Sequence, residues 1–374
     1  MIEFESTIQE KKQKKQKETK ASSVKIKVIG VGGAGCNILS RIYSPSKYSA
    51  SVNFVGIDSC KRTLESCVGF DKLQLGTSVV RGWGTGEDKE IARRIAEEAE
   101  DEIRSILSGT DLLFLVCGLG RGIGTGASPV ILKIAREIGI LTIGFFILPF
   151  YFEGEKRVNS AKEGLQKLEQ LTDGQVAISN NVLLRMSREN PNSSSLSVEE
   201  AFIKIDELFE MLLCSIEHIL YNSGIINLDF ADFNSFLSKG NQIIINRGKG
   251  RGENYVEEAF DQVLESPFWG RISLNKANGI LLSIHAGKEF PLDQLERILV
   301  LLQKESNNLT TPSFGIYTDE NMSEELILTL MVSTGKEARS EIKEEDKFYQ
   351  QDLDLRVYNQ HDLDVPTFLR RQHG

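Results

Sequence analysis

Two glycine-rich segments carry residues whose type and spacing are suited to binding phosphate. The first holds Gly30, Gly32, Gly33 and Gly35, between an apolar run and a helical pattern that opens at about Asn37. The second segment, GLGRGIGTGASP, has glycines at alternate positions, namely Gly118, Gly120, Gly122, Gly124 and Gly126. Glycine lets backbone N–H groups approach a phosphate closely, and a helix N-terminus adds partial positive charge. The two segments together predict a polyphosphate site.

The first segment alone also fits a dinucleotide site. Gly30, Gly32 and Gly35 spell GxGxxG, and Asp58 ends the next apolar run about where a ribose-binding acid is expected. An NAD-dependent oxidoreductase is therefore an alternative. The second segment favours a polyphosphate, because two loops would surround it from both sides. A tight strand-to-helix turn would explain one or two glycines, but not five.

The glycine segments must be positioned by the elements on either side of them. From Val24 onward, short apolar runs alternate with helical periods, the runs being VKIKVIG, VNFVGID, DLLFLVCG, ILTIGFFIL and VAIS. Strands that alternate with helices imply a parallel sheet covered on both faces. We therefore expect a Rossmann-like α/β nucleotide-binding domain at residues 24–194, with both glycine segments at the carboxyl ends of parallel strands.

A long helical period follows this domain. Its apolar positions recur every three or four residues and are Val198, Phe202, Ile205, Phe209, Leu212, Ile216 and Ile219. This spacing predicts a long central helix, mostly buried and ending at Gly224, within a segment of residues 195–232. From 233 to 335, strands and helices without glycine loops predict a smaller carboxyl-terminal α+β domain.

The end of the chain has a different composition. Residues 336–361 are charged and poor in aliphatic side chains, so they predict a linker. In residues 362–374, Val365, Phe368 and Leu369 have the i, i+3, i+4 spacing of one helix face. Three apolar side chains after a charged linker are typical of a helical ligand for a groove on a partner.

Composition excludes several classes of protein. The formal net charge of -9 argues against coating of nucleic acid. Residues 1–23 predict a flexible basic arm, in which glutamates reduce the net positive charge. The apolar stretch from Ile140 to Phe152 is too short to span a bilayer. The five cysteines have no CxxC spacing and predict reduced thiols. We expect a cytoplasmic protein with no nucleic-acid partner and no direct membrane insertion.

Five segments of the chain, taken in order, resemble the tubulin/FtsZ superfamily. VIGVGGAGCN is similar to its first phosphate loop, GRGIGTG (residues 120–126) to its GGGTGTG signature, and PFYFEGEKR to its ribose-binding segment. NLDFADF resembles the catalytic loop, and DVPTFLRR resembles the carboxyl-terminal peptide of bacterial FtsZ proteins. The last two are quite specific and favour FtsZ over tubulin. The resemblance implies a GTPase that polymerises head to tail into filaments for bacterial cell division.

The resemblance also implies roles for particular residues around GTP or GDP, with Mg²⁺ beside the nucleotide. The residues that would hold the phosphates are Gly32, Gly33, Ala34, Gly35, Gly84, Gly86, Gly120, Arg121, Gly122, Gly124, Thr125 and Gly126. Those near the ribose and the base would be Glu153, Arg157, Asn37, Asn180, Phe202 and Asp206. From the residues alone, Glu153 and Arg157 also fit a surface ion pair, and Phe202 also fits core packing.

Catalysis and membrane attachment are implied by the same resemblance. Asn227, Asp229 and Asp232 lie in a loop that, in the family, enters the nucleotide pocket of the next subunit, so that hydrolysis depends on assembly. Helix capping is the alternative for both aspartates. The residues that would bind a membrane-attached adaptor at the division site are Asp364, Val365, Pro366, Phe368, Leu369 and Arg370.

The phosphate loops depart from the family pattern at several positions. Arg121 and Ile123 stand where Gly and Thr are usual, residues 87–89 replace Ala-Asn-Pro, and Gly56 replaces an Asn. The lost hydroxyl and the added carboxylates predict weaker nucleotide binding, which the charge of Arg121 would offset. The main alternative is therefore a family member that binds nucleotide and forms filaments with little hydrolysis.

Overall fold

The computed structural model describes residues 24–189, 196–307, 310–320, 322 and 325–335. The predicted arm (1–23), linker (336–361) and adaptor-binding peptide (362–374) lie outside these residues. The boundaries expected between the domains stay predictions.

Six parallel strands form the amino-terminal half of the sheet. They are β1 (Ile26–Val31), β2 (Val52–Asp58), β3 (Asp71–Gln74), β4 (Leu112–Gly118), β5 (Leu141–Leu148) and β6 (Gly174–Ser179). Their order is β3-β2-β1-β4-β5-β6, and every neighbouring pair is parallel. This is the Rossmann order, in which the chain reverses its direction of winding between β1 and β4 and ligands bind at that point. The predicted Rossmann-like sheet is confirmed.

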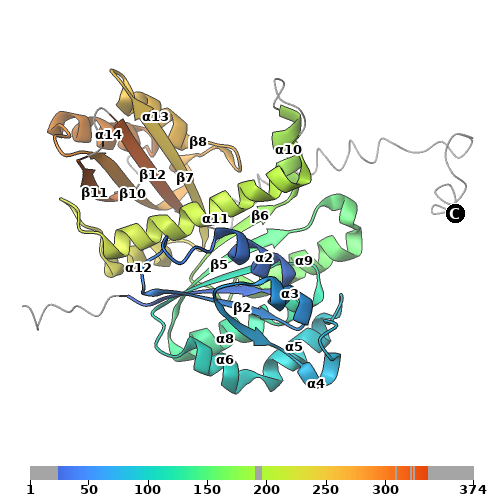
Figure 1. The fold of residues 1–374 in the computed structure, drawn as a ribbon. Helices are drawn as coiled ribbons and strands as arrows, with labels where there is room; N and C mark the ends of the chain where they lie inside the picture. The colour runs from blue at the N-terminus through green and yellow to red at the C-terminus, as the bar shows by residue number, and fades with distance from the viewer. Residues whose placement is uncertain (1–23, 190–195, 308–309, 321, 323–324, 336–374) are drawn as a thin grey trace, which may run out of the picture. The chain divides into compact units, whose positions relative to one another are not determined.

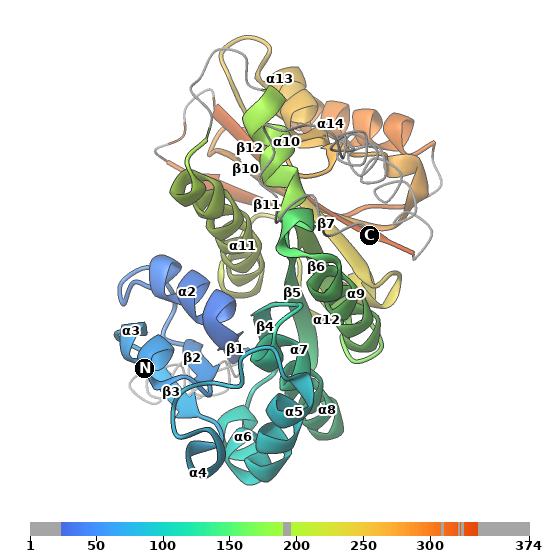
Figure 2. The ribbon, with the colours of Figure 1, turned by 90° about the vertical axis from the view of Figure 1, so that its right-hand side faces the viewer.

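Helices cover both faces of these strands, because successive strand residues point to opposite sides. On one face, Val28 and Phe114 join the core beneath α2 (Gly32–Ile42) and α11 (Val198–Tyr221). On the other face, Ile29 and Leu115 pack against a second group of helices. That group consists of α5 (Lys89–Glu98), α6 (Glu100–Leu107), α8 (Ser128–Ile138) and α9 (Glu155–Leu168). Figure 2 shows the two groups on opposite sides of the strands.

Short elements complete this half of the molecule. They are α3 (Lys61–Ser66), α4 (Thr77–Val80), α7 (Gly122–Gly126), the 3-10 turn η1 (Tyr151–Glu153) and α10 (Asn181–Glu189). Among the helices of the described residues, none combines the length and apolarity that crossing a bilayer requires.

The predicted central helix is α11, which runs alongside the parallel strands (Figure 1). It begins with a capping box in which Glu200 N donates to Ser197 Oγ at 3.2 Å and Ser197 N donates to Glu200 Oε2 at 2.8 Å. The helix ends at Tyr221 rather than Gly224, because Gly224 packs directly on the carbonyl of Ile316 instead. Most of its apolar stripe is buried.

Four longer strands and two helices form the carboxyl-terminal half, as the predicted α+β arrangement requires. They are β7 (Gln242–Arg251), β10 (Ala277–Gly287), β11 (Ser313–Asp319), β12 (Glu325–Thr334), α13 (Tyr255–Leu264) and α14 (Leu292–Glu305). Helix α12 (Phe230–Ser238) leads into them, and β8 (Glu265–Ser266), β9 (Gly270–Arg271) and η2 (Leu274–Lys276) are short. Strand β12 pairs antiparallel with both β7 and β10, while β10 pairs parallel with β11.

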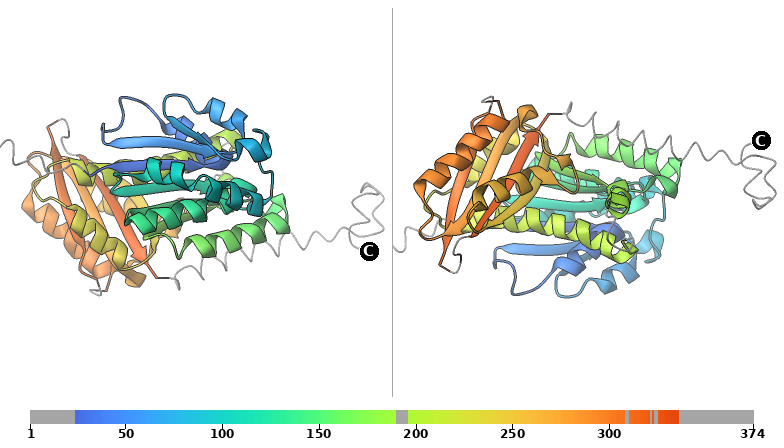
Figure 3. Two further views of the ribbon diagram at one scale, coloured as in Figure 1. Left: turned by 90° about the horizontal axis from the view of Figure 1, so that it is seen from below. Right: turned by 90° about the horizontal axis from the view of Figure 1, so that it is seen from above.

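The two halves share one continuous sheet. Strand β7 joins β6 through a single register pair, Gln175 with Gln242, which gives a ten-stranded sheet. Figure 3 shows the carboxyl-terminal strands running at a steep angle to the amino-terminal ones. The carboxyl-terminal half nevertheless has a hydrophobic core of its own, between its strands and helices α13 and α14.

Candidate nucleotide site

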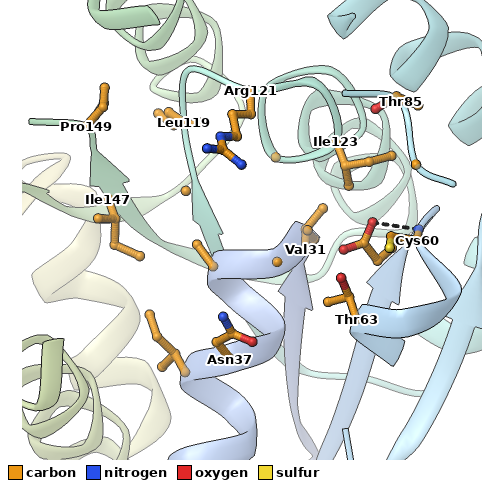
Figure 4. Close-up of a pocket in the computed structure, with 18 of the residues that line it drawn as sticks. Val31, Asn37, Cys60, Thr63, Thr85, Leu119, Arg121, Ile123, Ile147 and Pro149 are labelled. Carbon is orange, nitrogen blue, oxygen red and sulfur yellow. Dashed lines mark hydrogen bonds between the residues drawn. The ribbon is translucent and has the colours of Figure 1, made fainter. Parts of the chain in front are cut away.

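A cavity of about 590 Å³ lies at the carboxyl ends of β1 and β4, where the Rossmann order places a ligand (Figure 4). The residues predicted for the site that line it are Gly32, Gly33, Ala34, Asn37, Gly84, Gly86, Arg121, Gly124, Glu153, Arg157, Asn180 and Phe202. Predicted residues that do not line it are Gly35, Gly120, Gly122, Thr125, Gly126, Asp206, Asn227, Asp229 and Asp232. Most of the second group still shape the cavity, as the following contacts show.

The first loop turns from β1 directly into α2. Gly32 has a φ of 72°, which favours glycine, and Gly33 and Ala34 are exposed to the cavity. No side chain caps this helix and its first turn has no acidic residue. Its first N–H groups are therefore available to an anion, as at other helix N-termini that bind phosphate. Gly35 serves packing instead, because a Cβ there would overlap the carbonyl oxygen of Val116.

The second loop uses most of its glycines to bring backbone segments together. A Cβ on Gly124 would overlap the carbonyl oxygen of Gly118, and one on Gly126 would overlap that of Lys89. Gly120 has a φ of 98° and donates from its N–H to Thr125 Oγ1 at 2.9 Å. The Thr125 hydroxyl oxygen is thus engaged inside the loop. The alternate glycines set the shape of the loop, and only part of it faces the cavity.

A third loop, Gly84 to Gly86, lines the end of the cavity predicted to hold the phosphates. Both glycines have positive φ, 87° and 58° respectively. Gly122 N donates to the Gly86 carbonyl oxygen at 3.1 Å, so this loop is hydrogen-bonded to the second one. A Cβ on Gly122 would overlap Thr85 Oγ1, which explains why glycine is needed there.

Four buried polar atoms around the cavity have no hydrogen-bond partner among the described residues. They are Ser59 Oγ, Thr85 Oγ1, Arg157 Nε and Asn180 Oδ1, and all four residues line the cavity. Leaving a buried polar group unpaired costs about 1–3 kcal/mol, so such groups usually meet a ligand or water. A polar ligand that supplies both donors and acceptors would satisfy them. A nucleotide fits this requirement.

The end of the cavity predicted to hold the ribose has an ion pair beside a cationic loop residue. Glu153 pairs with Arg157, and Glu153 Oε1 also accepts from Phe150 N at 2.8 Å. Burial, together with the nearby positive charge of Arg121, lowers the pKa of Arg157, although Glu153 opposes this. Figure 4 shows Arg121 reaching into the cavity. Two cations at one cavity favour an anionic ligand.

The end of the cavity predicted to hold the base is lined by residues of α2 and α11. Asn37 of α2 faces the cavity (Figure 4), and Phe202 and Asn180 line it. Asp206 is buried one turn from Phe202 and accepts hydrogen bonds from Arg41 at 2.5 and 2.9 Å. Burial raises the pKa of the Asp206 carboxyl, and the guanidinium of Arg41 partly offsets this. Arg41 itself lines the cavity, so Asp206 acts on the cavity through its hydrogen bonds to Arg41.

Three predicted residues lie outside the cavity of their own chain, in the loop after α11 and in the first turn of α12. Asp229 caps α12: its Oδ1 accepts from Asp232 N at 2.7 Å, while its N–H donates to Asp232 Oδ2 at 3.1 Å. Asn227 Oδ1 accepts from Gly224 N at 2.5 Å. Ile316 pairs with Ile226 and holds the loop against β11. The capping alternative is therefore present in the structure, and it leaves both carboxylates near the surface.

Two expected carboxylates are not at the cavity. Asp88 caps α5, accepting from Glu90 N and Ile91 N at 2.9 Å each, and Glu87 lies 4.0 Å from the Lys156 ammonium. Neither residue lines the cavity. The repulsion expected between these residues and phosphates is therefore smaller than the sequence indicated, whereas Ile123 does line the cavity without offering a hydroxyl.

Comparison with known proteins identifies the family to which this fold belongs. Residues 25–188 match the Tubulin/FtsZ family, GTPase domain, and residues 241–337 match the FtsZ family, C-terminal domain. The cell division protein FtsZ of Coxiella burnetii is 32% identical over 351 residues, which cover 94% of this chain and 89% of the relative. That of Pseudomonas aeruginosa is also 32% identical, covering 95% and 91%.

The chain belongs to the FtsZ family. The solved structure of an empty FtsZ dimer from M. jannaschii agrees, with a TM-score of 0.74 at 28% identity, covering 88% of this chain and 93% of that one. A GTPγS-bound protofilament of CetZ2 from Haloferax volcanii has the same fold, with a TM-score of 0.69 at 19% identity over 88% of this chain and 99% of that one.

The FtsZ-family GTPase domain contains most of the cavity, so this chain binds and hydrolyses GTP. The match leaves the NAD-dependent alternative without support. Asp58, which that alternative used, accepts hydrogen bonds from Ser59 N at 2.6 Å and Cys60 N at 3.0 Å, and burial raises the pKa of its carboxyl. The Asp58 carboxylate therefore stabilises the turn after β2, and this engagement does not suit it to binding a ribose.

Sequence reasoning missed several polar residues of the cavity. Ser59, Thr63 and Thr85 carry no motif of their own, because each is a single hydroxyl in a turn or short helix. Arg41 could have been found, since it lies one helical turn after Asn37 on α2.

Proposed function

We propose that this chain is an assembly-dependent GTPase of bacterial cell division, which polymerises head to tail into filaments. The observation that carries the proposal is the set of unpartnered polar atoms, from Ser59, Thr85, Arg157 and Asn180, around one cavity of an FtsZ-family GTPase domain. Relatives of similar length are named cell division proteins.

GTP would lie with its phosphates between the three glycine loops. The N–H groups at the start of α2 and those around Gly86 would donate to phosphate oxygens, and Arg121 would add a charge-assisted hydrogen bond. Thr85 Oγ1 and Arg157 Nε would gain hydrogen-bond partners when the nucleotide binds. The sugar and the base would extend toward Asn180 and Phe202.

Mg²⁺ would be bound mainly through the nucleotide. Mg²⁺ keeps several waters and usually takes one or two carboxylates plus substrate phosphates. Among the described residues, no group of three or more His, Cys, Asp or Glu side chains could hold a metal. The ion would supply charge neutralisation between phosphate oxygens, while the chain's own residues orient the nucleotide.

Hydrolysis would require a second copy of the chain. The carboxylates that line the cavity are engaged: Asp58 by backbone N–H groups and Glu153 by Arg157. Asp229 and Asp232 each accept one backbone N–H as well, but they lie near the surface at the start of α12. In a head-to-tail filament they would enter the neighbour's cavity and orient the attacking water. Such an interface does not close on itself, so it generates an open filament.

The carboxyl-terminal peptide would connect filaments to the membrane. Val365, Phe368 and Leu369 would form one face of a short helix bound to a groove of a membrane-attached adaptor, with Asp364, Pro366 and Arg370 alongside. This arrangement would keep the protein in the cytoplasm and recruit it to the division site. The binding residues lie outside the described part of the chain, and their spacing in the sequence supports the proposal.

Measuring GTP turnover against protein concentration, with sedimentation in parallel, tests the proposal. We expect turnover per chain to rise steeply at the concentration where polymer first sediments. Asp232→Asn is the sharpest variant, because its amide oxygen can still accept from Asp229 N while the negative charge is lost. It should bind GDP with the affinity of wild type and hydrolyse GTP at least about tenfold more slowly, which corresponds to about 1.4 kcal/mol of activation free energy.

A matched control is Asp101→Asn, which removes a carboxylate from the exposed first turn of α6. It should leave turnover unchanged. Turnover per chain that does not depend on concentration would contradict catalysis by the neighbour. Filaments that form with GTP but turn it over at the rate of Asp232→Asn would favour the alternative of a filament-forming relative with little hydrolysis.

A further inference from the structure

Two cysteine side chains lie against each other behind the first phosphate loop. Cys36 is in the second turn of α2 and Cys67 ends α3, and both are fully buried. They form a small apolar cluster with Leu64 and the ring of Phe70. Each thiol donates to a backbone carbonyl oxygen, Cys36 Sγ to that of Gly30 at 3.5 Å and Cys67 Sγ to that of Thr63 at 3.6 Å.

Gly56 of β2 makes room for this pair. A Cβ at that position would lie 3.3 Å from Cys67 Sγ and 3.4 Å from Cys36 Sγ. Both sulfur atoms therefore occupy the space beside one residue that has no side chain. Any larger residue at position 56 would press on both sulfurs, so the glycine and the two thiols fit together as a unit.

The surroundings make the two thiols chemically unequal. The neighbouring Cys36 side chain lowers the pKa of Cys67 to about 6, helped by the Ser40 hydroxyl and the Lys72 ammonium, although burial and the Asp58 carboxylate oppose this. The Cys67 side chain and burial raise the pKa of Cys36. A thiolate is the nucleophilic form of cysteine, so Cys67 is the one that reacts first and Cys36 is placed to react second.

The remaining cysteines lack this arrangement. Burial raises the pKa of Cys117 to about 12, and burial also raises the pKa of Cys214. Cys60 lines the nucleotide cavity and is partly exposed. Among the described residues, only Cys36 and Cys67 share one cluster.

We propose that Cys36 and Cys67 form a reversible disulfide on exposure to peroxide, and that this bond weakens nucleotide binding. The Cys67 thiolate attacks one oxygen of hydrogen peroxide, giving a sulfenic acid and hydroxide. The Cys36 thiol then displaces the sulfenic hydroxyl group as water, which forms the S–S bond. In sum, two thiols lose two electrons and two protons, and one hydrogen peroxide becomes two waters.

Closing the bond requires a local movement that reaches the nucleotide site. The sulfur atoms, which share the space beside Gly56, must approach to about 2.05 Å. Helix α3 is short and its Glu65 and Ser66 side chains are exposed, so this segment can open to peroxide and shift. Cys36 follows Gly35 directly, and its Sγ lies 3.5 Å from the Gly30 carbonyl oxygen. Pulling Cys36 toward Cys67 therefore moves the start of α2.

The test uses the full-length chain, reduced and then treated with increasing hydrogen peroxide at pH 7.5. Remaining thiols are alkylated and the peptides are identified by mass spectrometry, before and after dithiothreitol. We expect one linked peptide pair, Cys36 with Cys67, that dithiothreitol restores. Calorimetric titration with GDP should show affinity at least about threefold weaker in the oxidised protein and recovery on reduction.

Two single variants make the outcome decisive. Cys67→Ser should form no internal disulfide and keep its GDP affinity under peroxide, whereas Cys214→Ser should behave as wild type. Circular dichroism establishes that both variants are folded. The proposal is overturned if Cys36 and Cys67 remain alkylatable when Cys60 has already reacted, or if Cys67 becomes only a sulfinic acid. Disulfide formation with unchanged GDP affinity would overturn its link to the nucleotide site. The peptide map needs no GTP turnover, so it stands apart from a failure of the proposed function.

Discussion

Arg121 occupies the cavity at a position where the family signature usually has glycine. It lies close enough to Arg157 that its charge helps to lower the pKa of that side chain. A phosphate between the two cations would remove this repulsion and gain a charge-assisted hydrogen bond. We therefore expect Arg121→Gly to weaken GDP binding about tenfold, or about 1.4 kcal/mol, in calorimetric titrations.

The control for this prediction is Arg121→Lys, which keeps the positive charge but loses the planar donors. It should fall between wild type and the glycine variant. If Arg121→Gly bound GDP more strongly than wild type, the arginine would be an obstacle to the ligand instead of a contact.

Arg41 and Asp206 form a partly buried ion pair next to the cavity, and removing one partner should give a pH-dependent loss of stability. Burial raises the pKa of Asp206 above its ordinary value, so in Arg41→Ala the folded protein would hold a proton there more strongly than the unfolded chain. Stability is therefore lost as pH rises above the unfolded pKa of about 3.9. We expect a cost of about 2 kcal/mol at pH 7.5, below the ~3–5 kcal/mol of fully buried pairs because Arg41 is 43% exposed.

Thermal unfolding at pH 5.0 and 7.5 measures this effect. Arg41→Ala should lose more of its Tm at pH 7.5, and adding Asp206→Asn should recover much of the loss by removing the charge. An equal loss at both pH values would show that Arg41 stabilises the protein through packing alone.

Residues within recognisable motifs were predictable, and isolated ones were not. Gly32, Arg121 and Glu153 stand in segments long enough to resemble a family, and the structure gathers them around one cavity. Ser59 and Thr85 belong to the same cavity as single hydroxyl groups, which no pattern distinguishes from ordinary turn residues. The pairing of Asp206 with Arg41 joins residues 165 positions apart, so only the folded chain reveals it.

Among the elements, the glycine-rich helix α7 depends on packing more than on its own sequence. Glycine costs about 1 kcal/mol in a helix relative to alanine, so five residues reading GIGTG would not form one alone. The helix persists because backbone contacts require small residues at Gly122, Gly124 and Gly126. Propensity could not predict such an element, whereas the alternating apolar runs did predict the parallel strands.

Gly126→Ala tests this dependence on close packing. Its Cβ would overlap the carbonyl oxygen of Lys89 and lie 2.8 Å from Ala92, so α5 and α7 would have to separate. Overpacking of this kind costs about 1–3 kcal/mol despite the better helix propensity of alanine. Thermal unfolding should therefore show a lower Tm, together with weaker GDP binding as the second loop shifts.

Gly33→Ala is the matched control for stability. A Cβ at Gly33 would meet nothing within 4 Å, and its φ does not need glycine. Its Tm should match that of wild type within about a degree, the effect of an exposed substitution of less than ~0.5 kcal/mol. A Tm for Gly126→Ala that equals this control would mean that α7 can move freely from α5.

On the scale of the whole molecule, the proposed function requires that one chain hold only part of the catalytic site. The cavity is built mainly from the parallel half, and the acids expected to act on a neighbour's nucleotide stand at the start of α12, after a loop in which Ile226 pairs with Ile316 of β11. Helix α11 connects the cavity, which Phe202 lines, with the segment that carries the two acids, which begins just after Tyr221.

The fold class was predictable from the order of strands and helices. The continuity of the sheet through the single pair Gln175 and Gln242 was not, because one long-range pair leaves no pattern in the sequence.

The carboxyl-terminal peptide should connect the whole assembly to the membrane without contributing to catalysis. A segment this short is marginal as an isolated helix, so its binding energy must come from apolar side chains placed in a partner's groove. Deleting residues 362–374 should leave GTP turnover and sedimentation unchanged while abolishing co-sedimentation with membrane vesicles prepared from the source cells.

Phe368→Ala should weaken binding to these vesicles at least about tenfold, since burying a Phe side chain is worth about 1.5–3 kcal/mol. Gln372→Ala, outside the apolar set, should bind vesicles as wild type does. Equal recruitment of the truncated and full-length chains would assign membrane attachment to another part of the molecule.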